Sequence, residues 1–483
     1  MRRNLEVREW RELLIGDDHS ITEQEAQRVH ALAEKISQRL KGRPPVLTRT
    51  SKPSLEAGQV VGVLTTPGVN LEILPKIEAD NRNDIRKSLI RMLALTHDLP
   101  IADHELAQLG IQHENLLEIL IRIFADRLLD AVRRGLPHRY LRHEDELPRL
   151  RGKLNVQRQF TRNAVRPDRL ACVFDEFSAN TPLNRVLKAA VVRLLTLSKS
   201  SANIRKLGEL LSRFDTVGES AAPLRERVAL DRTNQRYHQL HSLAKLILAR
   251  DWQNTTTGRS EGFSLLFPMN DLFEEYIGRC LKVALHHRSV KLQDTAHYAI
   301  EAPSRRFQLR PDIVVDDADG KIIIDTKWKQ LRPDKSNLGV EQADIYQLLA
   351  YARAYRAQRV ILLYPWHRNL NQPHAGICER WRSAGDPTTE FDIATVDVSK
   401  PNHEVRKTLR KILDSQSMTV VDRWTPVAET PSIKPNQRPV VEQRLAELES
   451  SGALVRAKAA EQTIQPVASR PGALARFIAE REG

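Results

Sequence analysis

The chain contains 483 residues, carries a formal net charge of +14 and has a pI near 9.7. This length predicts two to four domains with ample hydrophobic core, and the basic balance favours a polyanionic partner such as nucleic acid. We expect neither a membrane protein nor a secreted one, because no apolar run approaches the roughly 20 residues that span a bilayer and the basic first residues lack an apolar signal region.

The spacing of the cysteines and the lack of a nucleotide-binding motif exclude further classes of protein. The three cysteines are widely spaced and show no C-x-x-C pattern: Cys172, Cys280 and Cys378. We therefore expect no disulfide framework and no zinc site, and a reducing, cytoplasmic compartment. The chain also lacks a P-loop, so any nucleotide energy must come from a partner protein.

The first part of the chain is predicted to be rich in β-strands. A short strand at residues 5–10 precedes a capping box, formed by Thr22 and Glu25, that starts a helix. The hydrophobic period then changes to two, which predicts three strands, at 46–50, 59–66 and 70–76. Pro75 should end the third strand or place it at a sheet edge.

The hairpin between the last two of these strands is one hypothesis for a partner-binding surface. We interpret it as a long hairpin around Pro67 and Gly68, and the tips of such turns often carry function. Basic side chains at Arg49, Lys52 and Lys76 could meet an acidic surface, so residues 48–76 are expected to contact a partner protein and not DNA. The alternative is that these strands are only the core sheet of their own domain.

The middle of the chain reads mainly as helices. Helices are predicted at 84–95 and 115–134, from a capped start at Thr181 and Pro182, and at 203–214 and 234–250. Between them, residues 139–151 are dense in Arg and His and are broken by Pro148, which predicts a solvated linker or surface segment. A short strand is expected at 151–156.

A hairpin beyond residue 310 is the segment around which we expect the chemistry to be organised. Short β-branched runs at 313–315 and 322–324 are separated by a turn that contains Gly320. Asp312 starts the first strand, whereas Asp325 and Lys327 lie two apart near the end of the second and so share one face. Since a hairpin pairs the residues farthest from its turn, Asp312 should face Asp325, with Lys327 beside both.

Two carboxylates and an ammonium group on one face suit a metal-dependent hydrolase. Carboxylate oxygens are ligands for a hard cation such as Mg²⁺, and a bound cation can activate water against a phosphodiester. The lysine can orient or deprotonate that water, or neutralise the phosphate. The alternative is an exposed hairpin that carries ordinary surface ion pairs.

The pattern P-D followed by D-x-K resembles the PD-(D/E)xK nuclease superfamily, and the flanking segments fit this resemblance. Upstream, residues 269–277 predict a helix that Asn270 or Asp271 caps. The resemblance implies that a glutamate of this helix, Glu274 first and Glu275 second, reaches the metal. Downstream, Gln347 and Tyr351 stack on one helix face and match the Q-x-x-x-Y element of such nucleases.

A more specific resemblance covers roughly residues 1–410. Several motifs occur in the order seen in the McrC family, the nuclease subunits of the McrBC modified-cytosine restriction system: 71–77, 150–153, 174–185, 272–274, 310–312, 325–327 and 346–347. At Asp325 other nuclease families often carry Glu, and either carboxylate can bind a metal.

The McrC resemblance implies a division of labour. The N-terminal β-rich part would dock on a McrB-like AAA+ GTPase ring and stimulate it, and the C-terminal part would cut double-stranded, cytosine-modified DNA with Mg²⁺ or Mn²⁺. Catalysis would use Asp312, Asp325, Lys327, Glu274 and Gln347, with Asp312, Asp325 and Glu274 as metal ligands. Two alternatives remain: a stand-alone DNA repair nuclease of the same superfamily, and a non-catalytic activator of an AAA+ partner.

The predicted fold class is an α+β multidomain protein in four parts. These are an N-terminal β-rich and helical docking domain at 1–145, a helical connecting region at 146–257, an α/β PD-(D/E)xK nuclease core at 258–410, and a Pro-rich linker with a helical C-terminal extension at 411–483. The end of the extension, residues 469–477, is similar to the toxin-binding ends of some type II antitoxins, which implies that it binds another protein. The alternative is an unstructured tail.

Overall fold

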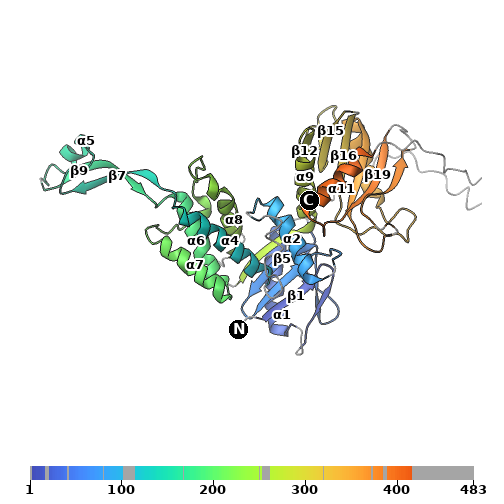
Figure 1. Ribbon diagram of the computed structural model, residues 1–483, viewed down its shortest axis with the longest axis horizontal. Coiled ribbons are helices and arrows are strands. Elements are labelled where there is room, and N and C mark those ends of the chain that lie inside the picture. Colours follow the sequence, from blue (N-terminus) through green and yellow to red (C-terminus); the bar gives the residue numbers. More distant parts are fainter. Residues whose placement is uncertain are drawn as a thin grey trace, which may run out of the picture. The chain divides into compact units, whose positions relative to one another are not determined.

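Two large β-sheets and a layer of helices organise the chain (Figure 1). The computed structural model describes residues 3–415 except 17–20, 41–42, 80, 100, 102–114, 167, 250, 253–261, 319, 371, 373 and 384–388. These residues belong to one compact unit, Met1–Ser415, with mixed α and β structure. The C-terminal extension from residue 416 lies outside the described residues. No described helix has the length and apolar character that a membrane crossing requires.

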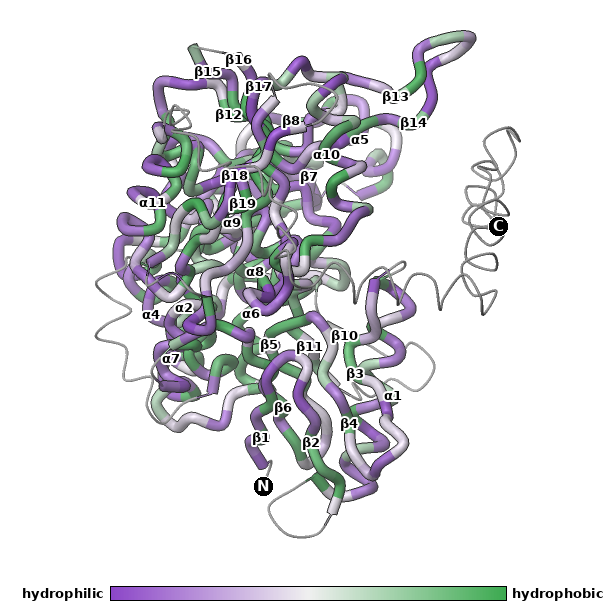
Figure 2. Tube along the Cα trace, turned by 90° about the vertical axis from the view of Figure 1, so that its right-hand side faces the viewer, coloured by the Kyte–Doolittle hydropathy of each residue, from purple (hydrophilic) through white to green (hydrophobic). Residues whose placement is uncertain are grey.

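The first large sheet contains strands from two distant parts of the chain. Its order is β1 (Arg3–Arg8), β6 (Val69–Leu74), β5 (Val60–Thr66), β11 (Gly262–Pro268) and β10 (Asp251–Trp252). All residues of β5 and β6 are buried, and β5 is hydrophobic along most of its length (Figure 2). β11 comes from near residue 265 and pairs with β5, so the N-terminal sheet is completed by residues beyond the predicted 1–145 segment.

The β5–β6 hairpin differs from the long hairpin that we expected. Only Pro67 and Gly68 connect the strands, and Gly68 has a φ of +96°, which suits the tight turn. The strands lie inside the core sheet, as in the alternative interpretation of residues 48–76. β6 ends at Leu74, as Pro75 predicts. Residues 48–53 form a largely exposed stretch of this segment, and Pro67 and Lys76 are exposed as well.

A smaller sheet and a helix cover one face of the N-terminal sheet. The small sheet has the order β2 (Glu12–Leu14), β4 (Ser54–Ala57) and β3 (Leu47–Arg49), and the helix is α1 (Glu23–Arg39). The predicted capping box is confirmed, since Thr22 and Glu25 bond each other's backbone at the start of α1. Residues of α1, β3 and β4 share a hydrophobic cluster with β5, β6 and Leu266 of β11.

The predicted helices of the middle region are confirmed with small shifts of their ends. They are α2 (Arg82–Thr96), α4 (Leu116–Arg133), α6 (Pro182–Leu197), α7 (Ser201–Arg213) and α8 (His238–Ala249). Asn115 and Thr181 cap α4 and α6 with their side chains. These helices bury their apolar faces in one continuous cluster with β5, β11 and the helix that follows β11.

The prediction of a linker or surface segment at residues 139–151 missed a strand, and the connecting region predicted as helical at 146–257 contains further strands. A three-stranded sheet occupies this part of the chain, with the order β7 (Arg139–Leu147), β9 (Leu170–Ser178) and β8 (Lys153–Leu154), beside the short helix α5 (Val156–Thr161). Most β7 side chains are exposed or half-buried on both faces, so the strand shows no alternation of apolar and polar residues that would predict it.

The second large sheet carries the predicted hairpin. Its order is β12 (Ser289–Leu292), β15 (Ile313–Asp317), β16 (Gly320–Thr326), β17 (Ala357–Pro365), β19 (Glu390–Val396) and β18 (Ile377–Arg382). Helices α9 (Met269–Ala284) and α11 (Asn402–Asp414) pack on one face, and α10 (Gln342–Tyr355) packs on the other. A separate hairpin, β13 (Tyr298–Ile300) and β14 (Arg306–Gln308), precedes β15.

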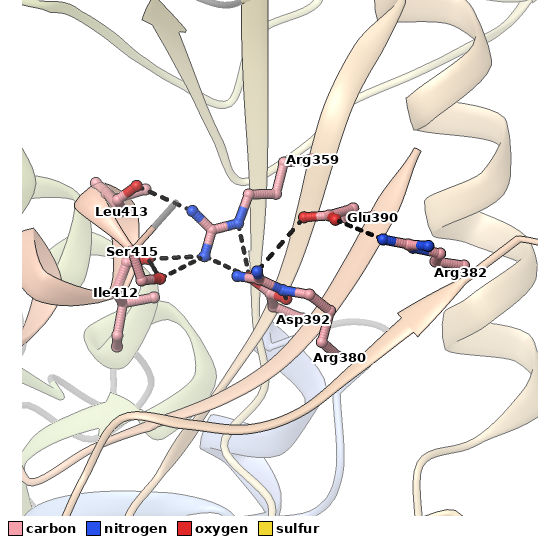
Figure 3. A network of polar contacts seen from close by, with 8 residues as sticks. All are labelled: Arg359, Arg380, Arg382, Glu390, Asp392, Ile412, Leu413 and Ser415. Carbon is pink, nitrogen blue, oxygen red and sulfur yellow. Dashed lines mark hydrogen bonds and ion pairs between the residues drawn. The ribbon is translucent and has the colours of Figure 1, made fainter. Parts of the chain in front are cut away.

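A buried arginine fastens α11 to this sheet (Figure 3). Arg359 of β17 donates from Nε to Asp392 Oδ2 at 2.6 Å and from its Nη atoms to the carbonyls of Leu413 and Ile412 at 2.9 and 2.7 Å. Arg380 of β18 binds the other Asp392 oxygen at 2.6 Å. The network thereby satisfies carbonyl groups that the end of α11 leaves without helical partners.

The two large sheets meet at a buried carboxyl group. Glu9 follows β1, is 1% exposed, and accepts hydrogen bonds from Lys76 N at 3.0 Å and from Trp328 Nε1 at 3.1 Å. Burial raises the pKa of Glu9 to about 8, although these two donors and the Lys76 charge oppose the rise. The carboxylate form of Glu9 is therefore unfavourable in the folded protein near neutral pH.

The burial of Glu9 predicts that the stability of the protein depends on pH, and that Glu9→Gln removes this dependence. Between pH 4.5 and 8 the folded protein holds a proton that the unfolded chain has released, so the free energy of unfolding falls as the pH rises through this window, by up to about 5 kcal/mol. The Gln variant has no such proton. Urea unfolding at pH 5.5 and pH 8 should therefore show the variant gaining stability relative to wild type as the pH rises, and parallel pH profiles would contradict the prediction.

Candidate functional site

The site forms where β15 begins and β16 ends. The two strands pair antiparallel with Ile313 opposite Ile324, as the sequence predicts, which brings Asp312 and Asp325 to the same end of the hairpin. Asp312 Oδ2 accepts hydrogen bonds from Thr326 N and Thr326 Oγ1, both at 2.8 Å. Asp325 is 2% exposed. The β-branched strands thus hold two carboxylates side by side, away from solvent.

Lys327 lies between two carboxylates. Its Nζ is 2.8 Å from Asp325 Oδ2 and 3.3 Å from Asp344 Oδ1, on the first turn of α10. Lys329 lies on the same side and forms a 2.7 Å ion pair with Glu341. The predicted group of Asp312, Asp325 and Lys327 is therefore brought together, and α10 adds a third carboxylate to it.

Burial and mutual repulsion shift the pKa values at this site. Burial raises the pKa of Asp312, and the nearby Glu274 charge raises it further. Burial also raises the pKa of Asp325, with a contribution from Asp312. Burial opposes the charged form of Lys327, yet Asp325 and Asp344 outweigh it and hold the lysine pKa above its ordinary value. Lys327 is thus a cation at neutral pH beside carboxylates whose charge is unfavourable.

Glu274 reaches the site from the first turns of α9. Its Oε1 accepts a 2.8 Å hydrogen bond from Gln293 Nε2, and Gln293 in turn accepts a hydrogen bond from Arg310. Burial raises the pKa of Glu274. Glu275, the second choice, instead pairs with Arg279 at 2.6 Å and does not share these contacts. Of the two candidates, the structure orients Glu274 toward Asp312.

The expected cap of this helix was wrong. The N-cap of α9 is Pro268, with no side-chain hydrogen bond. Asn270 instead exchanges hydrogen bonds with Gln59 at 3.0 and 3.2 Å, and Met269 N donates to Gln59 O at 3.2 Å. The free amide groups at the start of α9 are thus partly used by the N-terminal sheet, because β11 runs directly into the helix.

Gln347 connects to the site through a tyrosine. Gln347 Nε2 donates to Tyr351 OH at 2.7 Å, and Tyr351 OH donates to the Arg310 carbonyl at 3.1 Å. The predicted stacking of the two side chains on α10 is confirmed. Tyr351 is buried, whereas Gln347 is exposed, so Gln347 supports the segment that leads into Asp312 and does not touch the acidic cluster in these contacts.

Three residues that the sequence motifs do not identify make contacts at the site. Asp344 binds Lys327 from α10, Thr326 binds Asp312, and Gln293 links Glu274 to Arg310, with its own N donating to Asp312 O at 2.8 Å. Asp344 lies three residues before Gln347, so the helix period alone would have placed the two near one face. Gln293 follows an unpredicted strand, and only the fold brings it here.

The donor groups suit a hard cation. Asp344 Oδ2 is buried without a hydrogen-bond partner, and Asp312 Oδ1 takes no part in the Thr326 bonds. A divalent cation would neutralise carboxylates whose raised pKa values report unfavourable charge. As they lie, no group of three or more His, Cys, Asp or Glu side chains among the described residues is gathered tightly enough to hold a metal ion. A bound ion would thus require the side chains to close around it.

Comparisons with known proteins agree on one system. The model of a family described as "McrBC 5-methylcytosine restriction system component" matches residues 55–365. A solved half-complex of Thermococcus gammatolerans McrB AAA+ hexamers with bound McrC contains a chain that is 22% identical, with a TM-score of 0.66 over 85% of this chain and 100% of that one. A chain of the T. gammatolerans McrBC complex is 26% identical, with a TM-score of 0.49 over 59% of this chain and 88% of that one. No curated protein matches the chain.

The family match covers well over half of the chain, so this protein belongs to the McrBC 5-methylcytosine restriction system components. Its fold agrees with a chain of the McrB–McrC assembly over 85% of its length, and the McrC motifs occur in their expected order.

The unfavourable charge at the site predicts that a neutral side chain stabilises the protein. Asp325→Asn keeps the shape of the side chain and removes a buried charge that Asp312 repels. In metal-free buffer at pH 8, the variant should unfold at a higher temperature than wild type in calorimetry. Asp316→Asn, half-exposed at the other end of the hairpin and paired with Lys321, is the matched control and should not be stabilised. A lower midpoint for Asp325→Asn would contradict the charge assignment.

Proposed function

We propose that this chain is the endonuclease subunit of a McrBC-type restriction system and hydrolyses DNA phosphodiester bonds at a PD-(D/E)xK site. The observation that carries the proposal is the convergence of Asp312, Asp325 and Lys327 at one buried hairpin end. Paired carboxylates and a lysine in this arrangement suit phosphodiester hydrolysis better than a surface ion pair, because burial makes their charges costly without a ligand.

Asp312, Asp325 and Glu274 would hold Mg²⁺, or Mn²⁺ in its place. A cation there supplies charge for the phosphate oxygens and lowers the pKa of a bound water. Thr326 fixes one oxygen of Asp312, which leaves the other for the ion. Gln293 binds one oxygen of Glu274, and the glutamate would turn toward Asp312 and Asp325 when an ion binds.

Lys327 would act as a cation and not as a base. Because Asp325 and Asp344 raise its pKa, Lys327 keeps its proton at neutral pH. It can therefore orient the attacking water and neutralise charge that grows on the phosphate, while the carboxylates accept protons. Gln347, through Tyr351 and the Arg310 carbonyl, would steady the Pro311–Asp312 segment.

We further propose that the partner is a McrB-like AAA+ GTPase ring. In the T. gammatolerans assembly, McrC is bound to McrB hexamers. The basic net charge of +14 also suits DNA, and the system's description points to methylated cytosine as the mark that the complex reads. A stand-alone repair nuclease would instead cut without GTP or partner, and a non-catalytic activator would not cut at all.

Asp325→Ala tests the chemistry. Loss of one metal ligand should reduce DNA cleavage with partner, GTP and Mg²⁺ by at least about 100-fold, while stimulation of the partner's GTPase survives. The rise in unfolding temperature that Mg²⁺ gives wild type should also disappear. Asp316→Ala is the control on the same hairpin. Cleavage that persists in Asp325→Ala would show that the site is assigned wrongly.

Two exposed parts of the N-terminal half compete as the ring-binding surface. The 49–53 turn is the longest largely exposed stretch of the 48–76 segment, since the β5 and β6 strands are buried. The β7–β9 sheet and the adjoining helix α5 present aromatic side chains to solvent, with Tyr140 of β7 73%, Phe177 of β9 60% and Phe160 of α5 74% exposed. Such exposed aromatic residues are typical of protein interfaces.

Substitutions in the full chain separate these surfaces. Fragment 1–145 would lack β11, a strand of the N-terminal sheet, so the whole protein is the better sample. If the turn binds the ring, Lys52→Glu should lower GTPase stimulation at least about fivefold, whereas Tyr140→Ser with Phe177→Ser should not. The reverse result would assign docking to the β7–β9 sheet. Full stimulation by both variants would exclude both surfaces.

A further inference from the structure

Trp328, the residue after Lys327, binds residues next to the N-terminal sheet through both its side chain and its backbone. Trp328 is 6% exposed, and its indole Nε1 donates to Glu9 Oε2 at 3.1 Å. Its backbone carbonyl accepts a 2.9 Å hydrogen bond from Gln59 Nε2. Glu9 and Gln59 follow β1 and precede β5, respectively, more than 260 residues away in sequence. Two separate parts of the N-terminal sheet thus hold one residue of the nuclease hairpin.

The same tryptophan contacts the helix that supplies the glutamate. The rings of Trp328 and Phe273 lie 5.2 Å apart at 58°, in a tilted arrangement. Phe273 immediately precedes Glu274, just as Trp328 immediately follows Lys327. The aromatic pair therefore joins the two segments from which Glu274 and Lys327 reach toward the acidic cluster.

The polar contacts to Trp328 are more than packing requires. Glu9 Oε1 is buried without a hydrogen-bond partner, and burial makes the carboxylate form unfavourable. An apolar residue could fill this place at lower cost. A hydrogen bond in a buried environment fixes geometry more tightly than apolar contact does. Glu9, as the acceptor, therefore fixes the direction of the Trp328 indole ring.

We propose that Glu9 and Gln59 are positioning residues for the nuclease site: by holding Trp328, the N-terminal sheet sets the distance between Lys327 and Glu274. The proposal rests on the endonuclease function proposed above. Neither residue touches the acidic cluster in the contacts of the described chain, so each acts through Trp328. The cutting site is then complete only when it is packed against the N-terminal sheet.

Trp328→Phe is the principal test, because it removes the indole N–H and keeps an aromatic ring against Phe273. With full-length protein, partner, GTP and plasmid DNA, cleavage should fall about tenfold and the Mg²⁺ concentration for half-maximal cleavage should rise. GTPase stimulation should stay within about twofold of wild type. Glu9→Leu and Gln59→Leu should behave alike, whereas Glu9→Gln, which keeps the acceptor oxygen, should restore cleavage to within about threefold.

Trp381→Phe is the matched control. Trp381 Nε1 donates to Glu379 Oε2 at 2.7 Å on β18, so the control loses the same kind of bond elsewhere in the nuclease sheet. Trp381→Phe should cleave DNA like wild type.

Equal cleavage by wild type and Trp328→Phe would overturn the proposal. So would a parallel loss of cleavage and GTPase stimulation, which would indicate a general effect on the fold or on docking. If Glu9→Leu does not fold, Trp328→Phe and Gln59→Leu still decide. Failure of wild type itself to cut would reject the proposed function.

Discussion

Negative charge held out of solvent is the constraint on which this structure depends. Asp325 and Asp344 bind the half-buried ammonium group of Lys327, Asp312 and Glu274 lie nearby, and burial raises the pKa of Asp312, Asp325 and Glu274. Such a group would separate if its backbone were free to move, since water solvates carboxylates better than a protein interior does. The surrounding fold must therefore hold the strands and helices firmly enough to resist that repulsion.

The second large sheet supplies this rigidity from both faces. Apolar residues of β15 and β16 alternate between a cluster shared with α9 and α11 and a second cluster shared with α10. The parallel pairing of β16 with β17 continues beyond the strand, where Lys327 N donates to Leu363 O at 2.9 Å. At the far end, Arg359 binds the last carbonyls of α11 (Figure 3). Each charged residue thus projects from an element that is fixed at more than one point.

What the sequence predicts here follows from local physics. The β15–β16 hairpin, the α1 capping box and the helices α4 and α6 were predictable, because β-branched runs, a tight turn and side-chain caps act between near neighbours. The hairpin register then placed Asp312 with Asp325 correctly. β7 was missed because its side chains are exposed on both faces and follow no period of two. The cap of α9 was missed because Gln59, from another part of the chain, bonds Asn270 and Met269 N.

Contacts of long sequence separation account for the rest of the site. Gln293 reaches the site only through folding, and Glu9 reaches Trp328, the neighbour of Lys327, in the same way; neither belongs to a motif. Glu9 lies 319 positions before the tryptophan that it binds, so no local pattern could connect them.

The same contacts limit how a bound partner could act on the proposed nuclease site. β11 belongs to the N-terminal sheet and runs directly into α9, which carries Glu274, so no linker separates the two parts at this point. Gln59 and Glu9 close the junction from the other side. A protein bound to the N-terminal half would therefore influence the acidic cluster through packed side chains and a continuous strand–helix segment. The N-terminal sheet contacts both the helix that carries Glu274 and the residue next to Lys327. A shift of this sheet relative to α10 would therefore move Glu274 and Lys327 at the same time.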